Sequence, residues 1–308
     1  MFFKNILCFD IGNKNIKIVL GRVKNNIVKV DKCIMVSCKR EYIKDGEIIN
    51  FKNLKEIISE TIISNNILEK EVYCTINSSR IIQRNIIVPK ANNKELNTLI
   101  NFEVEEHIPI KIDNYVVQYK VLEEVENENI NKLKILVAMC PKELIERYFK
   151  LFRTLELKPM VLDTSFNSLE KIIKKSTMIN DKIFMEDSTL VFIDIGADNT
   201  TFSILKGNII EFTRVIPIEG NELNIDFWID KVKKIIKYYE NSKGGNSIDK
   251  VYIYGGNSNI TGIEEYMSRF LNIEVLKILS IDNIKFKCYE DSKQVYMYLN
   301  AIGALIRE

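Results

Sequence analysis

The sequence predicts an α/β fold made of two related halves. Apolar, strand-like runs alternate with amphipathic, helix-like segments along most of the chain. A strand–turn–strand pattern also occurs twice, around Asp10-Ile11-Gly12 and around Asp194-Ile195-Gly196, with turn residues at nearly equal offsets. A repeat of this length indicates duplicated halves rather than a tandem array of small units. The chain has 308 residues, of which 46% are hydrophobic and 28% charged, and this suits about two globular domains.

Each copy of the repeat is expected to form antiparallel strands joined by tight turns. Gly and Asn stand between the apolar runs, at the positions where hairpins require them. The predicted strands are 6–9, 16–20 and 27–30 in the first copy and 190–193, 200–205 and 209–212 in the second.

Two such turns that face each other would form a phosphate site. Backbone N–H groups at a glycine turn can hold phosphate oxygens, and the carboxylates of Asp10 and Asp194 can hold a hydrated Mg²⁺ ion. A single Asp-Ile-Gly carries little information, because an Asx turn that opens a hairpin needs only Asp and Gly. The duplicated pair therefore carries the prediction of a phosphate-binding cleft.

The rest of the first half contains a segment of different character. A helix over 51–63 and a strand over 72–76 continue the α/β pattern. We interpret the following residues, 79–131, as a small inserted subdomain that ends in an acidic, Asn-rich hairpin loop at 123–131. Its other expected elements are a strand over 81–89, a helix over 94–106 and a strand over 115–122.

The first-half pattern is expected to resume after this insertion. We predict a strand over 134–138, a helix over 141–157 with Pro141 at its first position, and a strand over 161–163.

The second half ends in a glycine-rich strand exit. After a helix over 226–241, the strand 251–254 runs into Gly255-Gly256-Asn257, and another helix is expected to begin near Thr261. Glycines at a strand exit let a ligand approach the backbone closely. Such a turn is common by itself, so it supports a site only together with the two Asp-Ile-Gly hairpins.

Composition excludes several classes of function. The net charge of +2 gives no electrostatic basis for binding nucleic acid or an anionic membrane surface. Six cysteines without a CxxC pair or ligand-like spacing suggest reduced thiols in a cytoplasmic protein and disfavour a metal site built on cysteine. No apolar stretch is long enough to span a bilayer, so membrane association is expected to come through a partner.

The motifs resemble those of the actin-like ATPase superfamily, and most closely those of its PilM family, the cytoplasmic actin-like component of the type IV pilus assembly platform. Residues 10–17 and 194–201 are similar to the two phosphate loops, and residues 253–262 to the adenosine motif. Residues 99–110, which read LINFEVEEHIPI, are similar to the PilM helix with paired acids and an Ile-Pro corner.

The resemblance implies an actin-like (ribonuclease H-like) two-domain fold with duplicated βββαβα halves. Residues 1–78 and 132–180 would form the first subdomain, 79–131 the inserted FtsA/PilM-type subdomain, and 188–308 the second subdomain, with the C-terminal helix packing back on the first. In PilM-like and FtsA-like chains a further subdomain, which grips ribose and adenine, follows the second hairpin. Here only residues 221–230 stand at that place, so this subdomain is expected to be truncated or missing.

The resemblance also implies a site for ATP and Mg²⁺. Asp10 and Asp194 would hold Mg²⁺ through water, Lys17 would face the phosphates, and Thr200 or Thr201 would add a hydroxyl. Because the nucleoside-gripping subdomain is expected to be truncated or missing, the sequence does not decide whether ATP binds and implies at most a weak ATPase activity. The predicted nucleotide-binding residues are Asp10, Gly12, Asn13, Lys14, Lys17, Asp194, Gly196, Ala197, Asp198, Thr200, Thr201, Gly255, Gly256 and Asn257.

Two departures from the family pattern concern the same site. Glu219 replaces the first glycine of an expected pair, and its carboxylate would repel a triphosphate. Asp163 falls at the first connecting segment, where a carboxylate could orient an attacking water. Capping of a helix at 165–174 is an equally supported role for Asp163.

The implied function is that of an adaptor. In the PilM family the inserted subdomain helps to hold the N-terminal tail of the membrane protein PilN as an extended peptide. The complex would place the chain at the inner face of the cell membrane and connect the pilus platform to cytoplasmic motor ATPases. The residues expected to line the peptide groove are Ile81, Ile86, Val88, Leu96 and Ile100.

Two alternatives come from other functional classes. An FtsA-like filament-forming ATPase is disfavoured because the chain stops at Arg307-Glu308 without an amphipathic membrane helix. A small-molecule kinase of the same fold is disfavoured because neither a catalytic base beside a substrate pocket nor a second large domain is found.

Overall fold

The chain divides into two units. A computed structural model describes residues 4–108, 110–127, 130–185, 187–207, 209–218, 225–242 and 247–307. The larger unit comprises Met1–Ser78 and Lys150–Glu308, and the smaller unit comprises Ser79–Phe149. Each unit has its own apolar core.

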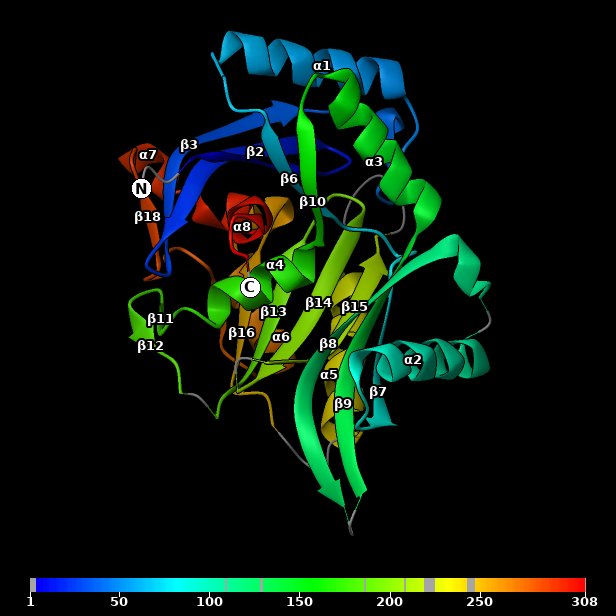
Figure 1. The fold of residues 1–308 in the computed structure, drawn as a ribbon. Helices are drawn as coiled ribbons and strands as arrows, with labels where there is room; N and C mark the ends of the chain where they lie inside the picture. Colours follow the sequence, from blue (N-terminus) through cyan, green and yellow to red (C-terminus); the bar gives the residue numbers. More distant parts are fainter. Residues whose placement is uncertain are drawn as a thin grey trace. The chain divides into compact units, whose positions relative to one another are not determined.

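Two sheets of the same topology form the larger unit (Figure 1). The first has the order β10-β6-β1-β2-β3-β18, and the second has the order β15-β14-β13-β16-β17. In both, the first of three consecutive antiparallel strands pairs in parallel with a fourth strand, β6 or β16, which in turn pairs in parallel with a fifth, β10 or β17; the first sheet also has β18, which pairs in parallel with β3. The α/β class and the duplication predicted from the repeated hairpin are confirmed.

The strands predicted for these sheets are longer than expected, and two short strands, β17 and β18, were not predicted. The first sheet contains β1 (Ile6–Ile11), β2 (Asn15–Lys24), β3 (Ile27–Ser37), β6 (Glu71–Ile76), β10 (Lys158–Thr164) and β18 (Ile284–Phe286). The second contains β13 (Thr189–Ile195), β14 (Asn199–Lys206), β15 (Ile209–Pro217), β16 (Lys250–Tyr254) and β17 (Val275–Lys277). The short hairpins β4 (Ile43–Lys44) with β5 (Glu47–Ile48) and β11 (Met178–Ile179) with β12 (Lys182–Ile183) stand apart from both sheets.

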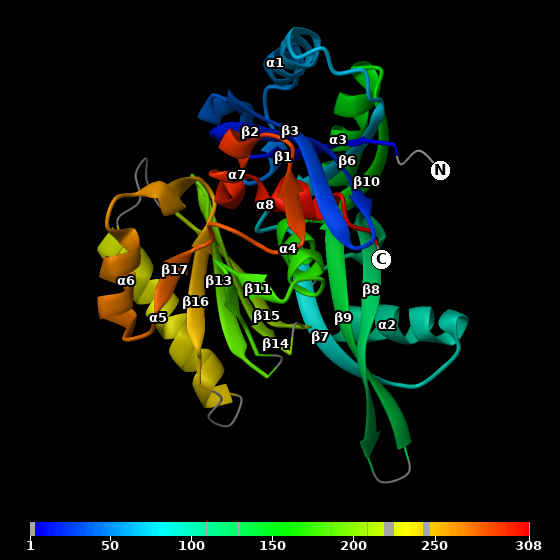
Figure 2. The same cartoon turned by 90° about the vertical axis from the view of Figure 1, so that its left-hand side faces the viewer.

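Helices cover both faces of the second sheet. Figure 2 shows α5 (Ile225–Ser242) and α6 (Ile263–Leu271) along one face, where their apolar side chains form a core with β13, β14 and β16. The opposite face packs on α4 (Ser165–Ile173) and α8 (Val295–Ala304). Strand β13 is buried along its whole length, as expected of a central strand with helices on both sides.

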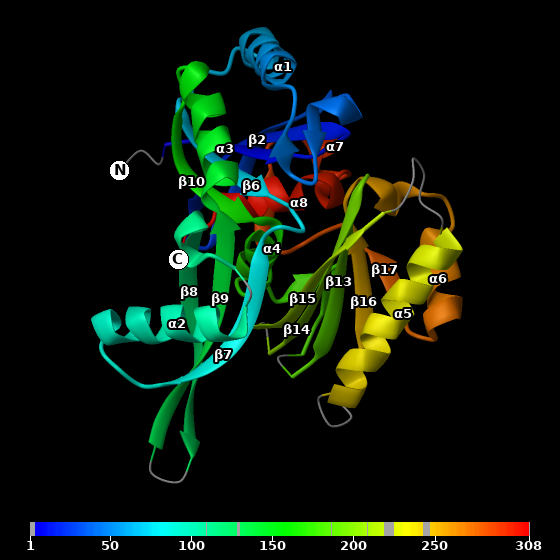
Figure 3. The same cartoon turned by 90° about the vertical axis from the view of Figure 1, so that its right-hand side faces the viewer.

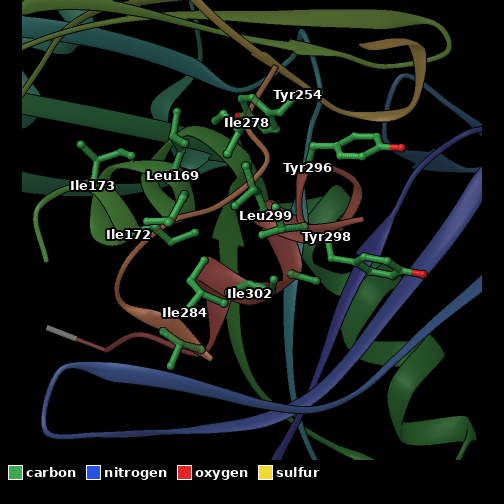
Figure 4. Close-up of a cluster of buried hydrophobic side chains, with 14 of the residues drawn as sticks. Leu169, Ile172, Ile173, Tyr254, Ile278, Ile284, Tyr296, Tyr298, Leu299 and Ile302 are labelled. Atoms are coloured by element: carbon green, nitrogen blue, oxygen red, sulfur yellow. The ribbon is translucent and has the colours of Figure 1, made fainter. Parts of the chain in front are cut away.

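The helices α4 and α8 also contact the first sheet. Helix α8 packs against β1, β2 and β6, as well as against β16 of the second sheet. Side chains of α4, α8 and β18 come together in one apolar cluster (Figure 4). At the crossing of the two helices, a Cβ added to Gly303 would lie 2.2 Å from the Ser168 carbonyl oxygen. The close approach of α4 and α8 therefore requires a glycine at this position.

Other helices of the larger unit are peripheral to this cluster. Helix α1 (Phe51–Ser64) begins at Asn50, whose side chain accepts a hydrogen bond from the Asn53 backbone N–H. Helix α3 (Lys142–Thr154) brings the chain back into the larger unit, where the Phe152 ring lies 5.1 Å from the Phe9 ring between centroids. The remaining short helices are η1 (Arg40–Tyr42), η3 (Gly256–Asn259) and α7 (Tyr289–Ser292).

In the smaller unit, a three-stranded antiparallel sheet packs against one helix (Figure 3). The strand order is β7-β9-β8, and the apolar face of α2 covers one side. Helix α2 starts after Asn92, which accepts hydrogen bonds from the backbone N–H groups of Lys94 and Glu95. The elements are β7 (Ile82–Pro89), α2 (Asn93–His107), η2 (Ile112–Asn114), β8 (Tyr115–Asn127) and β9 (Ile130–Pro141).

Three boundaries differ from the sequence predictions. The strand expected at 134–138 does not resume the first-half pattern, because it lies in β9, the central strand of the smaller unit. The compact smaller unit therefore ends at Phe149 and not at residue 131. The predicted loop 123–131 is largely strand, since cross-strand pairs such as Glu123–Lys134 allow charged residues within the hairpin.

The ends of two helices also differ from the sequence predictions. Pro141 closes β9, and α3 spans Lys142–Thr154 in place of 141–157. The helix expected near Thr261 begins at Ile263, because Gly262 adopts a left-handed conformation with φ of 77° just before it. Across the described ranges, no helix is long and apolar enough to cross a membrane.

Candidate functional site

Both Asp-Ile-Gly turns line one cleft in the larger unit. The first turn follows β1 and the second follows β13, and the glycine-rich exit of β16 lies beside them. The cleft encloses about 780 Å³ of space when its open mouth is included. It is lined by Asp10, Ile11, Gly12, Asn13, Lys14, Asn15, Lys17, Asn77, Asp194, Gly196, Ala197, Asp198, Asn199, Gly256, Asn257, Met297 and Asn300.

The two turns have the same backbone geometry. The N–H of Gly12 donates to the carbonyl of Asn15 at 3.1 Å, and the N–H of Gly196 donates to the carbonyl of Asn199 at 3.0 Å. A Cβ on Gly196 would lie 2.6 Å from that carbonyl oxygen. Both loops are therefore tight turns that present polar backbone to the cleft.

Gly255 brings the exit of β16 against the second aspartate. Its φ of +88° is in the left-handed region, and an added Cβ would lie 2.1 Å from Oδ1 of Asp194. Only glycine allows this approach without displacement of the carboxylate. Gly255 thus shapes the floor of the cleft, whereas Gly256 and Asn257 line it.

Asp10 and Asp194 are buried carboxylates that share one ammonium group. They are 5% and 4% exposed. Lys17, which pairs with Asp10 in the β1–β2 register, places its Nζ 3.0 Å from Oδ2 of Asp10. Burial alone would lower the pKa of Lys17, but the charges of Asp10 and Asp194 and the hydrogen bond to Asp10 raise it above its usual value. Lys17 therefore stays charged.

The carboxyl group of Asp194 has a perturbed pKa. Burial raises its pKa from 3.8 to about 6, and the negative charge of Asp10 adds to the effect, whereas Lys17 and a hydrogen bond from Asn300 oppose it. With two carboxylates and one ammonium, the centre has an excess of negative charge near neutral pH. A cation would be stabilised there.

Asn300 is a cleft residue that sequence reasoning missed. It lies on α8, and its Nδ2 donates to Oδ2 of Asp194 at 2.8 Å and approaches Oδ2 of Asp10 at 3.5 Å. No motif contains it. The available signal was a single Asn within the otherwise apolar run of the last helix, where a buried polar side chain needs partners.

Polar side chains from the first half also reach the second glycine turn and the strand that follows it. Asn13 donates to Asp198, and Arg40 lies 3.6 Å from the same carboxylate. Further along the chain, Asn77 donates to Oγ1 of Thr201 at 2.8 Å. These contacts hold the two loops together across the cleft.

Thr200 and Thr201 are buried behind the second loop. Both side-chain oxygens accept hydrogen bonds, that of Thr201 from Asn77 and that of Thr200 from Nε1 of Trp228 at 2.9 Å. Neither threonine lines the cleft. Trp228, the single tryptophan in the sequence, is 3% exposed and therefore reports on the environment of this loop.

Asp163 has buried partners of its own and does not line the cleft. Its carboxylate accepts hydrogen bonds from Nζ of Lys171 at 2.5 Å, from Nδ2 of Asn167 at 2.7 Å and from the N–H of Thr164 at 2.8 Å. Lys171 also donates to the carbonyl of Ile306 at 2.7 Å. The capping alternative does not hold as predicted, because the N-cap of α4 is Thr164, without a side-chain cap hydrogen bond, and Asp163 instead accepts hydrogen bonds from the side chains of Asn167 and Lys171.

Most residues expected to line a peptide groove lie in the core of the smaller unit. Val88, Leu96 and Ile100 are 1%, 3% and 1% exposed and pack together between α2 and the sheet, so they are not accessible to a peptide. Ile86 packs against the same core, and Ile81 is half-buried. Alternate side chains of a strand point to the same side, and the two β7 residues chosen for the groove, Ile86 and Val88, belong to the set that points into the core.

The residues of the cleft fit a magnesium ion held together with phosphates. Within the described ranges, no cluster of three or more His, Cys, Asp or Glu side chains could hold a metal. Mg²⁺, however, usually binds through one or two carboxylates, several waters and the phosphates of its ligand. Asp10 and Asp194 supply the two carboxylates, and Oδ1 of Asn300 is a buried oxygen without a hydrogen-bond partner in the described structure. Glu219 lies outside the described residues.

Comparison with known proteins gives a family and a fold. Residues 8–229 match the sequence model of a protein family that is described as type IV pilus assembly protein PilM. The structure is similar to a chain of a PilM–PilN type IV pilus biogenesis complex, with a TM-score of 0.83, 17% sequence identity and coverage of 97% of both chains.

More distant similarities extend over nearly the whole chain. A Bacteroides thetaiotaomicron protein with an actin-like ATPase fold has a TM-score of 0.53 and 10% identity, covering 99% of this chain and 96% of that one. The cytoplasmic domain of EpsL, an inner-membrane component of the Vibrio cholerae type II secretion system, has a TM-score of 0.52 and 9% identity, with 99% and 96% coverage. The fold is therefore actin-like.

Proposed function

The chain belongs to the PilM family of type IV pilus assembly proteins, and from this premise we propose that it is a cytoplasmic adaptor of the inner-membrane pilus platform. In this role it binds the N-terminal tail of a PilN-like membrane protein and is held at the inner face of the membrane by that partner. The observation that carries the proposal is the similarity over 97% of both chains to a protein from a PilM–PilN complex. The same platform would bring it to the pilus motor ATPases.

The edge of β7 is the proposed docking strand for the peptide. Within the described part of the smaller unit, β7 pairs with β9 on one side and has no strand on the other. An extended peptide can add to such an edge through main-chain hydrogen bonds. Ile87, which is 57% exposed, offers an apolar contact beside this edge. The peptide would then be held by the β7 backbone and not by the buried Val88.

Proline substitutions at neighbouring positions of β7 test this docking mode. In an antiparallel pair, successive residues direct their N–H groups alternately to the partner strand and away from it. Of Arg84 and Asn85, which pair with Val137 and Leu136, one therefore directs its N–H toward β9 and the other directs it away from β9. We expect the edge-facing proline to weaken binding at least tenfold with little loss of thermal stability, and the other to lower the melting temperature.

The assay is fluorescence anisotropy with a labelled synthetic peptide that corresponds to the N-terminal cytoplasmic tail of the PilN-like protein. The two proline variants serve as controls for each other, because they carry the same substitution at adjacent positions of the same strand. If Arg84→Pro and Asn85→Pro both bind the peptide as tightly as the wild type, β7 is not the docking strand.

The cleft supports a second component of the proposal, the binding of the phosphates of Mg-ATP. Two glycine turns, the charged Lys17 and the Asp10–Asp194 pair are the groups that would hold them. We propose that the nucleoside side is less well provided, because β15 ends at Pro217 and α5 begins at Ile225, and so short an intervening sequence is not expected to form a further subdomain. Since Asp163 is already paired, we propose at most slow hydrolysis.

Thermal stability tests this component. A ligand that binds only the folded state stabilises it by about 2.7 kcal/mol at a hundredfold excess over its dissociation constant. Millimolar Mg-ATP is expected to raise the melting temperature of the wild type, and Asp194→Ala is expected to abolish the rise. The absence of a shift in the wild type would refute nucleotide binding and leave the peptide proposal intact.

A further inference from the structure

Asn300 is a buried polar side chain at the centre of the cleft. It is 5% exposed, and its neighbours on α8, Leu299 and Ala301, are 1% and 0% exposed. A buried amide destabilises the folded state unless its oxygen and its NH₂ group both have hydrogen-bond partners. An Asn at this position of an apolar helix therefore needs a reason.

One end of the Asn300 amide is satisfied and the other is not. Nδ2 donates to Oδ2 of Asp194 at 2.8 Å, whereas Oδ1 is buried and has no hydrogen-bond partner among the residues that the structure describes. The orientation of the amide is well determined, since a flip would place Oδ1 against the carboxylate oxygen of Asp194. The unpaired atom is thus a buried acceptor on a residue that lines the same cleft as the two aspartates.

The position of Asn300 is held by contacts on the same helix. Three residues further along α8, Gly303 packs directly on the Ser168 backbone of α4. Beyond the helix end, the carbonyl of Ile306 accepts a hydrogen bond from Lys171. Because α8 is fixed at this end, Oδ1 of Asn300 is preorganised, as expected of a group that binds a ligand.

The groups around Oδ1 of Asn300 indicate which kind of hydrogen-bond donor would pair with it. Lys17, the cation beside the pair, lies against Asp10 at 3.0 Å, and Asp194 keeps a raised pKa in spite of it. A hydrated divalent cation brings both positive charge and O–H donors, and oxygen atoms are its preferred surroundings.

We propose that Asn300 belongs to the magnesium site of the cleft: its Oδ1 accepts a hydrogen bond from a water of the hydrated ion, while Nδ2 orients Asp194. This inference rests on the proposed binding of Mg-ATP. In this proposal α8 contributes to the magnesium-dependent part of the affinity for ATP, and the two glycine turns contact the phosphates.

Binding of ATP with and without Mg²⁺ separates this role from a structural one. Isothermal titration calorimetry gives the ATP affinity in excess Mg²⁺ and in EDTA, and the ratio of the two is the magnesium enhancement. Asn300→Leu has a similar size but no polar atom. We expect it to lose most of the enhancement, at least fivefold, and to keep its affinity in EDTA within about threefold.

Two further variants complete the test. Asn300→Asp keeps an oxygen acceptor and adds negative charge, so it should retain the enhancement while the affinity in EDTA falls. Asn257→Leu is a matched control, since Asn257 lines the cleft but donates to the Gly196 carbonyl at 2.7 Å. It should change both affinities by the same factor. Melting curves show whether each variant is folded.

The possible failures are distinguishable. If the wild type binds ATP with a magnesium enhancement and Asn300→Leu retains it in full, the role of Asn300 is refuted and the nucleotide site stands. Equal losses in Mg²⁺ and in EDTA for Asn300→Leu would show a structural role and refute the inference too. If the wild type binds no ATP under either condition, the nucleotide proposal fails and this inference fails with it.

Discussion

The contact between α4 and α8 makes Gly303 a sensitive position. A Cβ at Gly303 would lie 2.2 Å from the carbonyl oxygen of Ser168, 2.6 Å from its carbonyl carbon and 2.9 Å from its Cα. All three atoms belong to the backbone, so no rotamer change can relieve the overlap. To restore an ordinary contact of 3.4 Å to the oxygen, the helices must separate by 3.4 − 2.2 = 1.2 Å.

The expected free-energy change for Gly303→Ala combines two opposing effects. Overpacking in a close-packed core destabilises by about 1–3 kcal/mol, and a purely backbone overlap belongs at the upper end. Alanine in place of glycine within a helix stabilises by about 1 kcal/mol. The net destabilisation is therefore roughly 2 kcal/mol, which lowers the melting temperature of a chain of this size by about 4 °C.

Urea unfolding and thermal melts of Gly303→Ala measure this change directly. Gly256→Ala is the matched control, because a Cβ at Gly256 meets no atom within 4 Å. If Gly303→Ala is as stable as Gly256→Ala, the helices are not in contact as described. The variant should also weaken Mg-ATP binding, since Asn300 lies one turn away on the same helix.

The remaining predictions concern buried charge and backbone. Because burial raises the pKa of Asp194 from 3.8 to about 6, the folded state takes up a proton more readily than the unfolded chain, and stability falls as pH rises through this window. In chelator-containing buffer, Asp194→Asn should flatten that slope and melt higher than the wild type at pH 7; a lower melting temperature there would contradict the assignment. Gly255→Ala, with a Cβ 2.1 Å from Asp194, should abolish the thermal shift given by Mg-ATP, and an unchanged shift would show that the β16 exit does not shape the site. Lys171→Met leaves the buried Asp163 without its ammonium partner and should cost about 3–5 kcal/mol in urea unfolding, whereas a loss under 1 kcal/mol would mean that the pair is not buried.

The fold class could be predicted because its signals are local. Apolar runs, glycine turns and helical periodicity each lie within a few residues, and the repeat around Asp10 and Asp194 made the duplication visible. The partner of a strand is not a local property. Residues 134–138 were identified as a strand but assigned to the wrong unit, since a period-2 pattern does not say which sheet receives it.

The candidate site was also predictable only where its residues form a contiguous motif. Both Asp-Ile-Gly turns are contiguous in sequence, and the structure brings them together in one cleft. Asn77 and Asn300 were missed because single side chains from distant segments carry no motif. The groove prediction chose Val88 for its apolar character, although apolar residues on a two-layer unit are mostly its core.

The path of the chain through the larger unit has a consequence for biosynthesis. The first sheet begins at residue 6, yet its outermost strand, β18, and the helix that covers it, α8, come from residues 284–304. The apolar side of β1 and β2 therefore stays exposed on the nascent chain until residues 284–304 have left the ribosome, and such long-range contacts form slowly. The smaller unit, Ser79–Phe149, is contiguous and can fold long before. We expect nascent chains of this protein to depend on chaperones until α8 has been synthesised and can pack on β1 and β2.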